Sequence, residues 1–144
     1  MLMTNPTGLW LAALVRARQA EMANAAAVTA HRDFPLYRAV PLPEIAAVFA
    51  IAYQVLAESL EIGDLLPVHS YIRQVAVARL RGGATPADIV ALGEVLLAQV
   101  RAVIEAARPA DPVHADGALR LWEPIERSIR RILTDLPPEQ PPPA

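Results

Sequence analysis

The chain has 144 residues, of which 54% are hydrophobic and 5% aromatic, and its net charge is −2. This length suits one domain with its own core, and the near-neutral charge gives little general attraction to nucleic-acid phosphates or anionic lipid. All thirteen basic residues are arginine and cysteine is absent, which excludes lysine Schiff bases, thiol nucleophiles and disulfides. Since no apolar run approaches the roughly 20 residues that span a bilayer, we expect a soluble, cytoplasmic protein.

Glycine and proline divide the sequence into five predicted helices. The first covers about 7–30. The second opens at Pro43, a residue favoured at the first helical position, and Gly63 ends it. Its apolar face follows three- and four-residue spacing and consists of Ile45, Val48, Phe49, Ala52, Tyr53, Leu56 and Leu60.

The third and fourth helices are separated by the glycine pair Gly82-Gly83. The third is predicted to begin at Pro67, and its basic residues are expected to face solvent or a partner: Arg73, Arg79 and Arg81. The sequence Thr85-Pro86-Ala87-Asp88 then combines a capping threonine, a proline and an acid at the spacing that starts a helix. The fourth helix, to about residue 107, is apolar nearly all round, which is typical of a central helix.

The fifth helix follows a loop over 108–111 and ends near Leu136, with Pro124 expected to kink it or to mark its start. Its apolar residues alternate at three and four, as in a heptad seam: Ala115, Ala118, Trp122, Ile125, Ile129, Ile132 and Leu136. Two interpretations remain open. The helix packs on its own domain, or it forms a dimer through Trp122, Ile125, Ile129, Ile132 and Leu136. Beyond a domain over 1–136, the proline-rich segment 137–144 is predicted to be an extended tail or linker.

Catalytic and phosphate-binding motifs are missing from the sequence, so we predict no catalytic residues and no enzymatic activity. The histidines lack metal-ligand spacing, and no metal or cofactor is predicted. Aromatic side chains on the second and third helices are candidates for a small ligand pocket: Phe49, Tyr53 and Tyr71. The alternative is a haem slot in which His69 is the axial ligand and faces Phe49 or Tyr53.

Two segments resemble a known family: FPLYRAVPLPEI, over 34–45, and YIRQVAVARLRGGATPADIVAL, over 71–92. Their order is similar to that in the N-terminal domain of RsbR-type and RsbRD-type proteins, the co-antagonists of the stress regulator RsbT. The same domain precedes some transcription regulators and sensor kinases. The matching positions are Pro35, Tyr37, Pro43, Tyr71, Arg79, Gly82 or Gly83, and Ile89.

The resemblance implies a globin-like bundle that carries no haem, forms a homodimer and senses a stimulus upstream of an output domain. In RsbR-type proteins that output is a STAS domain with phosphorylated threonines. No such segment follows 137–144 in this sequence, so no phosphorylation site is transferred. Three hypotheses are carried forward: a non-haem sensory dimer of the stressosome type, a haem-binding gas sensor that uses His69, and a plain protein-interaction scaffold.

Overall fold

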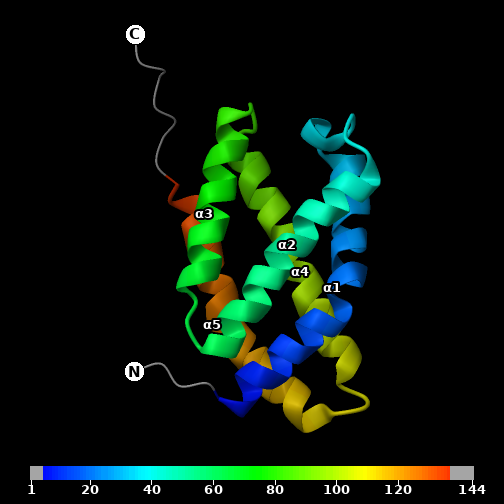
Figure 1. Cartoon of the computed structure of the whole chain (residues 1–144), viewed down its shortest axis with the longest axis vertical. Helices are drawn as coiled ribbons and strands as arrows, with labels where there is room; N and C mark the ends of the chain where they lie inside the picture. Colours follow the sequence, from blue (N-terminus) through cyan, green and yellow to red (C-terminus); the bar gives the residue numbers. More distant parts are fainter. Residues whose placement is uncertain (1–4, 137–144) are drawn as a thin grey trace.

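The computed structural model describes residues 5–136, and within that range the chain is an all-α bundle of five helices without a strand (Figure 1). The predicted fold class is thus confirmed, whereas the predicted tail over 137–144 lies outside the described residues. The elements, in chain order, are α1 (Pro6–Asp33), the short 3-10 turn η1 (Pro35–Tyr37), α2 (Leu42–Ile62), α3 (Leu66–Arg81), α4 (Pro86–Ala107) and α5 (Pro112–Thr134).

The helices begin and end where local chemistry satisfies their free backbone groups. At the start of α4, the Thr85 hydroxyl accepts from the Asp88 N–H at 3.1 Å, and the Asp88 carboxylate accepts from the Thr85 N–H at 3.2 Å. This is the predicted capping box. At the end of α2, Gly63 adopts φ 71°, a left-handed conformation that glycine takes without a steric penalty.

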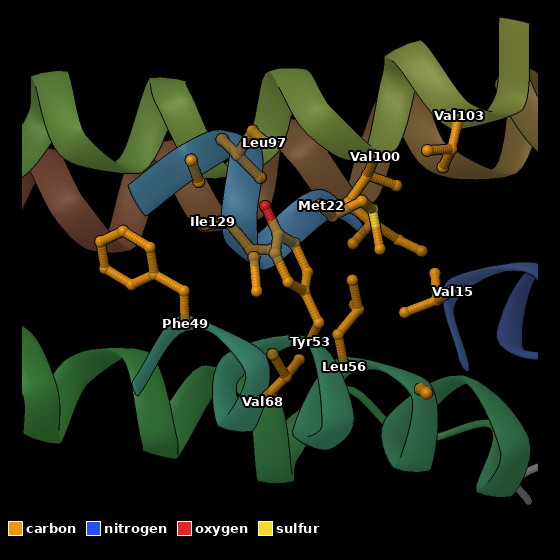
Figure 2. Packing of buried hydrophobic residues seen from close by; sticks show 14 of the residues in the cluster. Val15, Met22, Phe49, Tyr53, Leu56, Val68, Leu97, Val100, Val103 and Ile129 are labelled. Atoms are coloured by element: carbon orange, nitrogen blue, oxygen red, sulfur yellow. The ribbon is translucent and has the colours of Figure 1, made fainter. Parts of the chain in front are cut away.

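The core lies between all five helices, and α1 makes its most extensive contacts with α2. Alanines dominate the buried face of α1, which allows the two helices to approach closely: Ala12, Ala23, Ala26, Ala27 and Ala30. Larger side chains fill the centre of the bundle. Figure 2 shows Val15 and Met22 of α1 meeting Leu56 of α2 and Val100 of α4 in this layer.

The α4–α5 pair is held by one close contact and by ion pairs across its surface. A Cβ atom at Gly93 would collide with the Leu133 Cδ1 atom, so a larger residue at this position requires the Leu133 side chain to move. Arg130 contacts Glu94 at 2.6 Å and Glu126 at 2.8 Å, and Arg101 lies 3.3 Å from Glu126. The Glu126 carboxylate is buried, yet both of its arginine partners remain partly exposed. These contacts fix the register of α5 along α4.

The seam of α5 is covered mainly by the chain itself. Trp122 is 0% exposed, Ile125 5% and Ile129 4%, so these three residues are not on a surface that a second copy can contact. The prediction that they line a dimer interface is wrong, because the seam's partners are the helices of the same bundle. Ile132 and Leu136 are only half-buried and remain candidates. Pro124 lies inside a continuous α5 and does not start it.

Helix α2 corrects the expectation that no apolar run approaches the length that spans a bilayer. Among the described residues it is long and apolar enough to cross a membrane, with a mean hydropathy of 1.6 over its most apolar window. The segment 45–57 carries no charged residue, because the acids of α2 lie toward its two ends. However, its inner face packs into the core through residues such as Phe49, Tyr53 and Leu56. That arrangement also occurs in core helices of soluble proteins, with which the structure is compatible.

Candidate ligand-binding cavity

A cavity of about 110 Å³ lies between α2, α3, α4 and α5 and is partly open to solvent. Its walls are almost wholly apolar. Three small residues, Ala52, Ala76 and Gly93, line it where larger side chains would fill the space. The other lining residues are Tyr53, Leu56, Val68, Tyr71, Ile72, Val75, Arg79, Ile89, Leu92, Leu96, Leu97, Val100, Trp122, Ile129 and Leu133. Concave, mainly apolar sites with a few polar groups are typical of small-molecule binding.

Two of the three predicted pocket residues line this cavity. Tyr53 extends from α2 toward α4, as Figure 2 shows, and its hydroxyl donates to the Leu96 carbonyl at 2.7 Å. Burial raises the pKa of Tyr53 well above its usual range. Tyr71 lines the cavity from α3. Phe49 does not line it. The Phe49 ring meets the edge of the Tyr37 ring with 5.9 Å between centroids.

Two of the residues that line the cavity have a buried polar atom that lacks a hydrogen-bond partner among the described residues. These atoms are the indole Nε1 of Trp122 and the Nε of Arg79. An unpaired buried donor costs about 1–3 kcal/mol. The guanidinium of Arg79 lies 5.7 Å from the centre of the Tyr37 ring, an arrangement that compensates part of its desolvation. Both residues line the cavity, but protein atoms cover these two nitrogen atoms almost completely.

Neither donor was identified as a pocket residue from the sequence. All three arginines of the third helix were expected to face solvent or a partner. Arg73 and Arg81 are exposed, but Arg79 is half-buried. The helical spacing contained the necessary information: Arg79 follows Ile72 by seven residues and Ala76 by three, which places it on their face. Burial raises the pKa of the neighbouring Tyr71, and the positive charge of Arg79 opposes that shift.

A second cavity, of about 200 Å³, adjoins the first. The two share Arg79, Ile89 and Leu92 as lining residues. The walls of the second come from η1 and its flanks, the end of α3 and the start of α4, and they include Tyr37, Gly82, Gly83 and Asp88. Arg79 thus lies at the junction between an apolar cavity and a more polar one.

His69 lines neither cavity. Its Nε2 lies 3.0 Å from the Ser128 hydroxyl on α5, and that hydroxyl donates to the Ile125 carbonyl at 2.8 Å. Burial lowers the pKa of His69, and the charge of Arg73 lowers it further. His69 bonds to α5 and is absent from the lining of the apolar cavity, so this arrangement gives no support to the predicted haem slot between His69 and Phe49 or Tyr53. In the described part of the chain, no three histidine or acidic side chains are grouped as metal ligands.

Comparison with known proteins returned no match: no family model, no curated protein and no solved structure is similar to this chain.

Proposed function

We propose that this protein is a non-catalytic regulatory module that binds a small, mainly apolar molecule in the cavity between α2, α3, α4 and α5. The observation that carries the proposal is the apolar cavity, whose lining includes two residues with unpaired buried N–H donors, Trp122 and Arg79. A residual core defect would leave apolar space, but buried donors without partners are rare in native structures. A small rotation of either side chain toward the cavity would let an acceptor atom of a ligand supply the missing partner.

Helix α5 is the route by which occupancy of the cavity reaches the surface. It contributes Trp122, Ile129 and Leu133 to the cavity wall, and the half-buried Ile132 lies on the same helix near its end. A ligand that contacts Trp122 differently in two positions of α5 shifts the balance between those positions. The output is a homodimer contact or a partner protein at the end of α5.

The resemblance to RsbR-type N-terminal domains assigns the same role. Under that resemblance the module is a cytoplasmic, globin-like stress-signalling domain that dimerises, and its partner is a STAS-type output domain. The end of α5 offers Ile132 and Leu136 for the dimer, so Ile132→Arg is the appropriate substitution. Ile129→Arg is unsuitable because it would place a charge in the core. Light scattering is expected to show a dimer for the natural chain and a monomer for Ile132→Arg. A monomeric natural chain would contradict dimerisation.

Ligand binding is tested with a single-tryptophan protein. Trp10 and Trp122 are the two tryptophans, and Trp10 stacks on His114 with 5.8 Å between ring centroids, outside the cavity lining. In the Trp10→Phe protein all tryptophan emission comes from Trp122. We expect hexanol to change this emission saturably. If neither hexanol nor other small apolar probes change it, the cavity is not a ligand site and the scaffold hypothesis replaces this one.

A further inference from the structure

Within residues 5–136, Arg79 and Arg101 are the half-buried arginines. Arg101 lies 3.3 Å from the Glu126 carboxylate. Among the described residues, no carboxylate forms an ion pair with Arg79, and its Nε makes no hydrogen bond. A half-buried guanidinium is desolvated in part, and an anion is the partner that returns the most free energy to it.

The surroundings of Arg79 determine where such an anion lies. Arg79 lines both the apolar cavity and the second cavity. One acid, Asp88, also lines the second cavity, and its carboxylate accepts the Thr85 N–H at 3.2 Å. Asp88 repels an anion there, so the anionic group belongs at the junction, against Arg79, with its apolar part in the apolar cavity.

The shape of the apolar cavity limits the length of the ligand. Its lining runs along α4 from Ile89 to Val100, a rise of about 16 Å at 1.5 Å per residue. Two ion pairs show that α5 runs antiparallel to α4, because Arg130 pairs with Glu94 whereas Glu126 pairs with Arg101. Trp122 is one turn before Glu126 on α5, so it lies toward the Val100 end of the cavity. The charge and the buried indole are thus at opposite ends of the cavity.

The volume gives a second limit. About 110 Å³ is somewhat less than the roughly 150 Å³ of an apolar cavity that admits benzene. A narrow space of this volume holds an alkyl chain of about six carbons. A bulky aromatic acid or a long-chain fatty acid would exceed it without movement of the helices.

We propose that the ligand is a short aliphatic monocarboxylate, of about six carbons, whose carboxylate binds Arg79 and whose chain extends toward Trp122. This inference rests on the proposed function, because it names the ligand class of the same cavity. It adds the claim that Arg79 is the residue that selects a carboxylate over a neutral molecule of the same length.

The test compares hexanoate with hexanol, two probes of equal chain length, on the Trp10→Phe protein at about pH 7.5, where a carboxylate is ionised. We expect hexanoate to bind more tightly. In an added Arg79→Gln substitution, hexanoate affinity is expected to fall about tenfold or more, the effect of losing one charge-assisted hydrogen bond. Hexanol affinity is expected to change by less than about threefold. Arg73→Gln is the matched control, because Arg73 is exposed on the same helix and lines neither cavity. It is expected to change neither affinity.

Asp88→Asn adds a gain-of-binding arm. The amide keeps an acceptor for the Thr85 N–H but removes the like charge, so hexanoate is expected to bind more tightly and hexanol unchanged. Equal affinities for both probes, or equal losses for both in Arg79→Gln, would overturn the carboxylate assignment and leave the proposed cavity function intact. Failure of both probes to bind would overturn both proposals. Circular dichroism of each variant verifies that it is folded.

Discussion

Replacing Trp122 by phenylalanine tests whether its indole N–H is an unpaired buried donor. Trp122 is fully buried, and its Nε1 has no partner among the described residues. Phenylalanine has about three ring atoms fewer, whose burial is worth roughly 2 kcal/mol at about 0.8 kcal/mol per carbon. Removing an unpaired buried N–H returns about 1–3 kcal/mol. The two effects nearly cancel, so the free energy of unfolding of Trp122→Phe is expected to lie within about 1 kcal/mol of that of the natural chain.

Urea unfolding followed by far-ultraviolet circular dichroism measures this difference, because the signal does not depend on tryptophan. Trp122→Ala has no compensating ring and is expected to cost about 3–5 kcal/mol. Tyr53→Phe is the paired control: its hydroxyl donates to the Leu96 carbonyl at 2.7 Å, so the loss of that bond is expected to cost about 1 kcal/mol. A loss greater than about 2.5 kcal/mol for Trp122→Phe would show that the indole N–H has a partner, and the cavity would lose one of its two free donors.

Three further predictions test local features of the fold. Thr85→Ala removes the cap of α4 and is expected to cost about 1 kcal/mol in urea unfolding; an unchanged midpoint would mean that the cap contributes nothing. Burial lowers the pKa of His69, so the native state favours the neutral imidazole. The contribution of His69 to native-state stability is therefore present above the unfolded pKa of about 6.5 and is lost as the pH falls through the folded pKa. His69→Gln is expected to reduce the loss of stability between about pH 7.5 and 5.5, and an identical slope in both proteins would refute this. The effects of Gly93→Ala and Leu133→Ala on the free energy of unfolding are expected to be non-additive. The double variant is expected to lose about 1 kcal/mol less than the sum of the two single losses, because Leu133→Ala removes the clash that Gly93→Ala creates. Additive effects would mean that Leu133 moves aside freely.

Local signals predicted the helices well because they act over a few residues. The threonine, proline and aspartate at 85–88 start α4, and Gly63 ends α2 in the left-handed conformation. The first helix continues to Asp33, three residues beyond the predicted end, because no glycine or proline interrupts it before Pro35. Helix boundaries depend on caps and breakers, which are visible in the sequence.

The partners of each apolar face were harder to predict. The heptad spacing of α5 identified the buried side of the helix, but spacing carries no information about which surface covers it. The residues Trp122, Ile125 and Ile129 turn to the chain's own core. The cavity shows the same limit: Tyr53 and Tyr71 were identified from their helix faces, whereas Phe49 packs against η1 through Tyr37. Unfilled space arises from three-dimensional packing, and no local pattern encodes it.

The most direct test of ligand binding in the cavity is an NMR measurement of nuclear Overhauser contacts between hexanoate and the full chain. If hexanoate binds in the cavity, its methyl end is expected to contact the Trp122 ring and the methyl groups of Leu97 and Val100, which line the cavity. Added hexanol is expected to remove these contacts by competition. Contacts confined to exposed apolar residues such as Ile51 and Ile62, or no contacts at all, would contradict the claim that the cavity is a binding site.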